Sequence, residues 1–198
     1  MLIYRVKMWE WYRIDLKGQF NYFYDNMSKG KKFYNEWNKK DSLFALWIGN
    51  NDIINLYKKN VTSEIDEITD NLFDTIEKMY IVGARNILIL KIFQKNYIIN
   101  KNKSYLKNDI LRFNNNIITK SKILFEKYPD INLIIYNTPD KLEEVISNCN
   151  AYKFKDCVNN WDKNKDIKEF FWVNSHISDP GNKILAQDIN DLLDSLNK

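Results

Sequence analysis

Histidine and cysteine are scarce in this sequence, which contains one histidine and two cysteines among its 198 residues. A structural zinc site is usually built from four cysteine or histidine ligands. The chain holds too few of these ligands for such a site, so we expect neither a metal nor a cofactor. Glycine and proline are also rare, with five and three residues, and this composition indicates no particular function.

Long hydrophobic runs are absent as well. A transmembrane helix needs about 20 consecutive apolar residues, and Lys, Asn or Asp interrupts every apolar run in this chain. The sequence therefore predicts no membrane-spanning helix and no membrane partner. Residues 1–15 lack the apolar segment and small-residue cleavage site of a secretory signal peptide, so the chain as written encodes no export signal.

Charge of one sign does not accumulate anywhere along the chain. The 30 basic and 26 acidic side chains are spread over the whole length and leave a net charge of +4. Proteins that bind nucleic acids usually present a clustered basic face. We therefore expect no nucleic-acid partner.

Apolar periodicity predicts strands that alternate with helices. Continuous apolar runs typical of buried strands occupy residues 42–48, 85–92 and 130–136. Amphipathic patterns predict helices over residues 8–26, 31–37, 62–83, 103–127, 139–149 and 180–196, with a polar loop over 150–165. This order indicates an α/β fold in which helices cover both sides of a parallel sheet. We expect one domain over residues 1–198.

Polar residues follow the first predicted strand, at Gly49 to Asp52. Ligands bind at the carboxyl ends of the strands in parallel sheets, and we expect the segment FFWVNSHISDPGN, with His176, to lie at the same edge. Two interpretations remain open from these residues alone. The first is a catalytic site, and the second is a capped strand-to-helix turn with a structural histidine.

Two separated stretches resemble motifs of the GDSL, or SGNH, family of ester hydrolases. WIGNNDI at 47–53 is similar to the third block of that family, Gly-x-Asn-Asp, and FFWVNSHISDPGNKILA at 170–186 is similar to its fifth block, Asp-x-x-His. IDLKGQF at 14–20 and SYLKNDILRFNNNI at 104–117 resemble helices of the family. The segment LFALWIGNNDI resembles the corresponding segment of the fungal group that includes carbohydrate acetylesterases.

This resemblance implies a three-layer α/β/α, flavodoxin-like fold and the hydrolysis of esters. The implied substrates are acylated small molecules or acetylated polysaccharides, and the full-length family implies an extracellular, secreted location. IFQKNY at 92–97 lacks the prolines that relatives often carry after that strand, which predicts a different substrate loop.

The resemblance also implies roles for individual residues. His176 would remove the proton from a serine nucleophile, and the Asn51 amide, beside Gly49, would stabilise the oxyanion. Asp52 would anchor the turn or cap the next helix, and Asn174 would support the imidazole.

Cys149 and Cys157 are close enough in sequence to close a small loop by a disulfide, and two reduced thiols are the alternative. A similar pair occurs in relatives of the family, so the resemblance favours the disulfide.

Two departures from the family pattern bear on activity. No Gly-Asp-Ser occurs anywhere in the chain, which predicts an N-terminal truncation that removes the first strand and its nucleophile. The expected acid of the fifth block is replaced by Val173 or Asn174, and an asparagine side chain would favour the wrong imidazole tautomer. Ser175 and Ser178 stand beside His176 and are poor substitutes for the nucleophile.

The alternative function is therefore a catalytically inactive relative, a pseudoenzyme with a binding or structural role. A missing strand would leave an open sheet edge, which predicts poor solubility or self-association. The sequence does not determine the oligomeric state.

Overall fold

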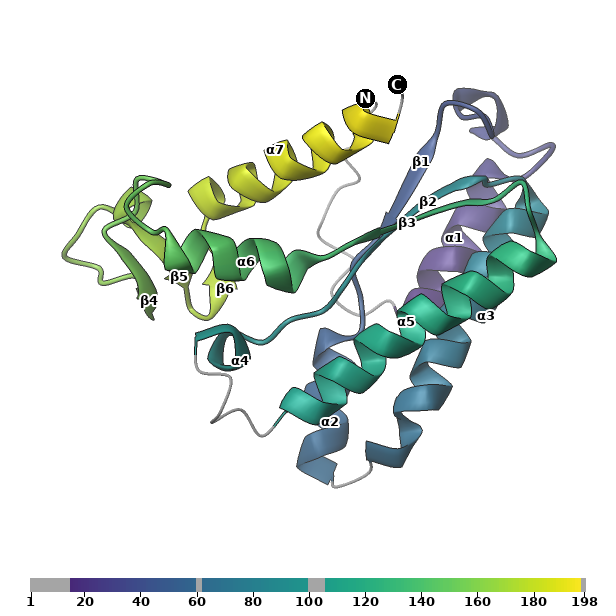
Figure 1. The fold of residues 1–198 in the computed structure, drawn as a ribbon. Coiled ribbons are helices and arrows are strands. Elements are labelled where there is room, and N and C mark those ends of the chain that lie inside the picture. Colours follow the sequence, from purple (N-terminus) through teal and green to yellow (C-terminus); the bar gives the residue numbers. More distant parts are fainter. Residues whose placement is uncertain (1–14, 60–61, 100–105, 197–198) are drawn as a thin grey trace.

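The computed structural model describes residues 15–59, 62–99 and 106–196 (Figure 1). Its helices are α1 (Leu16–Met27), α2 (Asn50–Lys59), α3 (Ile65–Val82), α4 (Lys95–Ile99), α5 (Lys107–Lys127), α6 (Thr138–Ser147) and α7 (Asp179–Leu196). Its strands are β1 (Leu43–Leu46), β2 (Asn86–Leu90), β3 (Asn132–Tyr136), β4 (Asp156–Asn160), β5 (Phe170–Val173) and β6 (His176–Ile177). Short 3₁₀ turns occupy Tyr34–Glu36, Thr62–Glu64 and Ile167–Glu169.

The first sheet contains β1, β2 and β3 in that order, and all three strands are parallel. In its register Leu43 lies beside Asn86, and Asn86 lies beside Asn132. The strands therefore begin at one edge of the sheet and end together at the other. The predicted α/β fold with a parallel sheet is confirmed.

The central strand β2 lies in the core of the molecule. Ile87 and Ile89 are at most 1% exposed, and burial of a side chain of this size contributes about 1.5–3 kcal/mol to folding. Helices α3 and α5 pack beside each other, and their buried faces include Ile76 and Phe113. Helix α3 ends at Gly83, whose φ of 126° is a conformation that glycine adopts without steric cost.

An aromatic cluster attaches α1 to the outer strand. The ring of Phe23 on α1 lies 5.3 Å from Phe44 on β1 and 5.6 Å from Trp37. Asp15 caps α1 by accepting a hydrogen bond from the Gly18 amide at 2.8 Å. Helix α1 begins at Leu16, and residues 8–14 of the predicted helix lie outside the described residues.

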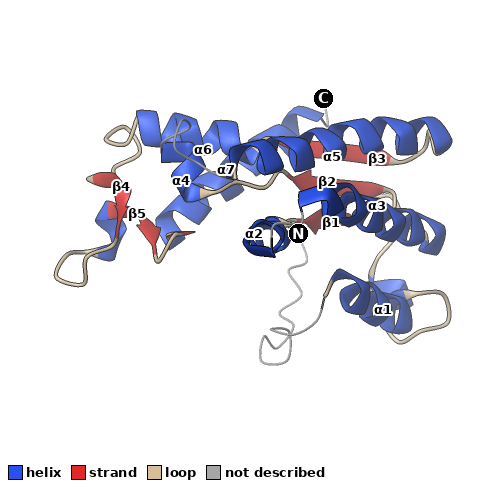
Figure 2. Ribbon diagram, turned by 90° about the horizontal axis from the view of Figure 1, so that it is seen from below, coloured by secondary structure: helices blue, strands red, loops and turns tan. Residues whose placement is uncertain are grey.

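The polar segment after α6 differs from its prediction. We predicted a loop over residues 150–165, but strand β4 lies within it and pairs in parallel with β5, which in turn pairs antiparallel with β6. The prediction was wrong because β4 carries three exposed residues and lacks the apolar run that marks a buried strand. The second sheet lies apart from the first (Figure 2).

A disulfide and a buried indole attach β4 to its surroundings. Cys149 and Cys157 are bonded, with their Cα atoms 5.9 Å apart. The Trp172 side chain is fully buried, and its Nε1 donates to the Cys157 carbonyl at 2.8 Å. These contacts hold the polar strand in place where its own side chains contribute little burial.

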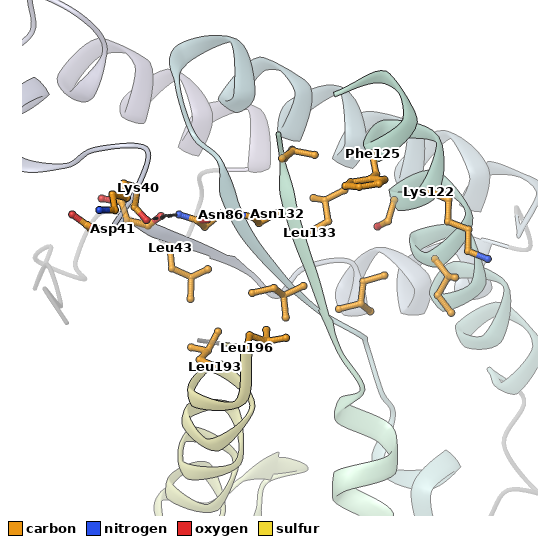
Figure 3. Close-up of a pocket in the computed structure, with 16 residues that line it drawn as sticks. Lys40, Asp41, Leu43, Asn86, Lys122, Phe125, Asn132, Leu133, Leu193 and Leu196 are labelled. Carbon is orange, nitrogen blue, oxygen red and sulfur yellow. Dashed lines mark hydrogen bonds between the residues drawn. The ribbon is translucent and has the colours of Figure 1, made fainter. Parts of the chain in front are cut away.

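The outer side of β1 is open in the part of the chain that the structure describes, since β1 pairs there with β2 alone. A largely apolar cavity of about 940 Å³ is lined by Leu43 of β1, by residues 132–135 of β3 and by residues of α5 and α7. Figure 3 shows Leu193 and Leu196 at the end of α7 pointing toward strands β1 and β3, which contribute Leu43 and Leu133. None of the described helices has the length and apolar character needed to cross a bilayer.

We expect Leu43→Lys to reduce self-association of the protein. Leu43 is 39% exposed on the open strand, and a lysine on an edge strand opposes pairing with another chain. The change should alter the free energy of unfolding by less than about 0.5 kcal/mol, as exposed substitutions usually do. Size-exclusion chromatography with light scattering measures the associated fraction.

Ile81→Lys is the matched control, because Ile81 is 72% exposed on α3. It should leave association unchanged. An equal effect of the two substitutions would show that β1 is not the associating edge.

Candidate active site

A cleft of about 480 Å³ opens at the carboxyl ends of β1 and β2. It brings together three segments that are far apart in the sequence: residues 47–54, residues 93–95 and residues 175–182, which run from the β5–β6 turn into the start of α7. Its lining residues are Trp47, Ile48, Gly49, Asn50, Asn51, Asp52, Ile54, Phe93, Gln94, Lys95, Ser175, His176, Ile177 and Asn182. The two stretches singled out in the sequence thus meet in one cleft.

The larger cavity beside β1 is a poorer candidate for catalysis. Its lining includes Ser42, Asn86 and Asn132, which lie before or at the start of the strands, together with residues of α5 and α7. Ligands of parallel sheets bind at the opposite, carboxyl edge, and His176 does not line this cavity. We therefore place the candidate active site in the cleft of His176 and Asn51.

Gly49 shapes the first wall of the cleft. Its φ is 109°, a conformation that L side chains rarely adopt, and a Cβ atom placed there would lie 2.3 Å from Cζ of Phe113. Phe113 on α5 is fully buried, so neighbouring side chains oppose a displacement of its ring. Only glycine therefore fits between the end of β1 and the Phe113 ring.

Helix α2 begins directly after this turn and carries Asn51 and Asp52 in its first turn. Both side chains are exposed, and the structure shows no hydrogen bond from either to another described residue. The Asn51 amide is therefore available to a ligand. The Oδ1 atom of the neighbouring Asn50 is buried without a hydrogen-bond partner among the described residues.

Asn114 shapes the second wall. This buried residue follows Phe113 on α5, and its amide binds both backbone groups of Ile92: Oδ1 accepts from the Ile92 amide and Nδ2 donates to the Ile92 carbonyl, each at 3.0 Å. Ile92 is the point where the chain leaves β2 and enters the cleft wall at Phe93. Two consecutive residues of one helix thus support both walls.

The third wall is the hairpin that carries His176. Strands β5 and β6 are joined by Asn174 and Ser175, whose φ angles of 49° and 65° are both left-handed, as in the tight turns typical of two-residue hairpins. The Ser175 amide donates to Oδ1 of Asn160 at 2.9 Å. This bond fixes the turn to strand β4.

The His176 imidazole is exposed in the cleft, and its Nδ1 lies 3.0 Å from the backbone carbonyl oxygen of Asn174. A carbonyl oxygen can only accept a hydrogen bond, so this contact requires the proton on Nδ1. The lone pair of Nε2 is then free to accept a proton, as a general base needs.

This contact involves a different group of Asn174 from the side chain considered in the sequence. The backbone carbonyl, rather than the side chain, contacts the ring. The carbonyl carries no charge, however, and it stabilises an imidazolium less than a carboxylate would.

The two serines beside His176 differ in their surroundings. Ser178 is buried, and its Oγ accepts a hydrogen bond from the Gly181 amide at 3.4 Å at the start of α7. Ser175 is exposed and lines the cleft. No serine hydroxyl is hydrogen-bonded to His176 within the described ranges.

Phe93 and Lys95 also line the cleft, although no motif in the sequence assigned a role to either side chain. The missing prolines of IFQKNY marked the loop as unusual, but its position in the cleft depends on Asn114. Burial lowers the pKa of Lys95 from its usual value, and the charge of Asp156 opposes that shift. In the described part of the chain no three His, Cys, Asp or Glu side chains are grouped as metal ligands.

The sequence profile of the GDSL-like lipase/acylhydrolase family matches residues 12–189. The chain belongs to this family, and the resemblance noted in the sequence is confirmed. A protein described as an acetylesterase, from Thermothelomyces thermophilus, is 26% identical over 172 residues, which cover 81% of this chain and 55% of that protein. The chain thus spans about half the length of this curated relative.

We expect Gly49→Ala to destabilise the fold by about 2–4 kcal/mol. The cost combines the left-handed backbone with overpacking against Phe113. Urea unfolding measures the free energy of unfolding. Gly30→Ala is the control, because Gly30 has a φ of +83° but no atom within 4 Å of the added Cβ. Equal costs at the two positions would contradict the packing argument.

We expect Asn114→Ala to lower the free energy of unfolding by about 2–4 kcal/mol, since it leaves two buried groups of Ile92 unpaired. Asn115→Ala is the matched control on the exposed side of the same helix turn. It should cost less than about 0.5 kcal/mol, and thermal or urea unfolding of both variants gives the comparison.

Proposed function

We propose that the cleft hydrolyses carboxylic esters, with acetyl esters as the first candidates. The observation that carries this proposal is the His176 ring, held by the Asn174 carbonyl in the tautomer that a general base requires. Family membership and the acetylesterase relative support the reaction class. The proposed substrate is an acetylated carbohydrate or another small acylated molecule.

The proposed reaction assigns one task to each side chain. Nε2 of His176 removes a proton from a hydroxyl group or a water molecule as its oxygen attacks the ester carbonyl. The negative charge moves to the carbonyl oxygen, where the Nδ2 amide of Asn51 donates a hydrogen bond. When the tetrahedral intermediate collapses, the imidazolium returns the proton to the departing alcohol.

Two attacking oxygens are compatible with these roles of His176 and Asn51. With water as the nucleophile, the chain would hydrolyse the ester in a single displacement. With a hydroxyl group, the same base and amide would act on a covalent acyl intermediate. Both routes use His176 and Asn51 in the same roles, so substitutions at these residues test both.

A second candidate function is binding without turnover. Two observations favour it: the orienting group of His176 is a neutral carbonyl, and the exposed indole of Trp47 supplies a stacking surface at the cleft wall. In this case the cleft would retain an ester or sugar ligand without cleaving it.

We expect His176→Ala to reduce hydrolysis of 4-nitrophenyl acetate to the rate in buffer. Asn51→Ala should lower kcat by about 10²–10³-fold, the usual effect of losing one oxyanion donor. Absorbance of released nitrophenol measures the rate. Asn55→Ala is the control, because Asn55 is exposed on α2 but does not line the cleft. Turnover that survives His176→Ala would contradict the proposal, and wild-type protein without turnover would favour binding.

A further inference from the structure

Lys95 introduces a positive charge into the wall of the cleft. It follows Phe93 and Gln94 where the chain leaves β2, and these residues line the cleft together with Asn51 and His176. The position of this loop is set by the hydrogen bonds of Asn114 to Ile92. The backbone that carries Lys95 is therefore fixed to the core by hydrogen bonds.

The ammonium group of Lys95 is not ion-paired, and the charge of Asp156 acts on it only from beyond ion-pair distance. Its Nζ donates to Oδ1 of Asn160 at 2.8 Å and lies 5.4 Å from the centre of the Trp172 ring. Among the described residues it forms no ion pair. Lys127 and Lys155, by contrast, contact Glu77 and Glu169 at 2.6 and 2.5 Å.

This difference has an energetic consequence. Hydrogen bonds to the glutamates raise the pKa of Lys127 and Lys155, whereas burial lowers the pKa of Lys95. A partly buried cation that has no ion-pair partner is destabilised relative to water, and the charge of Asp156 offsets only part of this cost. An anion that entered the cleft would offset this cost, and a neutral group of the same shape would not.

The remaining walls restrict where such an anion can lie. Asp52 lines both the cleft and a neighbouring pocket that Asp15 also lines. Its carboxylate would repel an anion from that side of the cleft. Trp47 is 45% exposed, and its ring centre lies 5.8 Å from that of Phe93. These two rings offer an apolar face to the body of a ligand, next to Lys95.

We infer that Lys95 is a specificity-determining residue that binds a carboxylate of the ligand, so that the cleft selects esters of acidic molecules such as uronic acids. The ester part of this inference rests on the proposed function. The carboxylate part rests on the unpaired ammonium group alone. In this arrangement the ligand ring lies on Trp47 and Phe93, and its carboxylate accepts hydrogen bonds from Nζ of Lys95.

Binding of D-glucuronate and of its neutral amide, D-glucuronamide, followed by tryptophan fluorescence or by NMR of the indole groups, tests this inference. Wild-type protein should bind glucuronate about tenfold more tightly, which is the usual effect of one charged hydrogen bond. Lys95→Gln should remove that preference, although glutamine keeps an N–H donor for Asn160. Lys95→Arg should retain it, and 0.5 M salt should weaken it.

Lys163→Gln is the matched control, because it removes one exposed positive charge that does not line the cleft. It should leave the preference unchanged. Equal binding of the two ligands by wild-type protein, or an undiminished preference in Lys95→Gln, would overturn the inference.

The titration needs no turnover, so it separates this inference from the proposed function. Hydrolysis of 4-nitrophenyl acetate without a preference for glucuronate would overturn the inference and leave the proposed function standing. A preference that depends on Lys95, in a protein without esterase activity, would support the inference and contradict the proposed function.

Discussion

The packing of Phe113 and Asn114 on α5 is the constraint on which the cleft depends. The Phe113 ring lies against the backbone of Gly49 at the end of β1, and the Asn114 amide binds both backbone groups of Ile92 beyond the end of β2. Because the strands are parallel, both ends lie at one edge of the sheet. One helix turn therefore sets the distance between the segment of Asn51 and the segment of Lys95.

The second sheet positions the third wall by different means. Its strands are short, and β4 is largely polar. The disulfide between Cys149 and Cys157 and the buried Trp172 indole hold it in place. Oδ1 of Asn160 then accepts hydrogen bonds from both the Ser175 amide and Lys95, so the hairpin of His176 and the loop after β2 share one anchor.

The surroundings of His176 separate two requirements of a general base. The first is the correct tautomer, which the Asn174 carbonyl provides through its contact with Nδ1. The second is stabilisation of the imidazolium, which a neutral carbonyl provides only weakly compared with a carboxylate. In the proposed reaction, His176 would therefore be a base of the right geometry with limited electrostatic support.

The sequence by itself determined the parts of the structure that depend on local pattern and composition. Continuous apolar runs predicted β1, β2 and β3, and helical periodicity predicted α3, α5 and α7, because burial of these faces dominates their free energy. The motifs at Gly49 to Asp52 and at His176 identified the family, and the family profile confirmed it.

Only the tertiary structure decided the features that depend on contacts between distant residues. Strand β4 has no apolar pattern of its own, and it exists through pairing with β5 and the disulfide. The tautomer of His176 depends on a backbone carbonyl, which no side-chain pattern reveals. Lys95 lies in the cleft because Asn114, 19 positions later in the chain than Lys95, is hydrogen-bonded to the backbone of Ile92. Backbone hydrogen bonds and long-range packing carry no signature in the local order of residues.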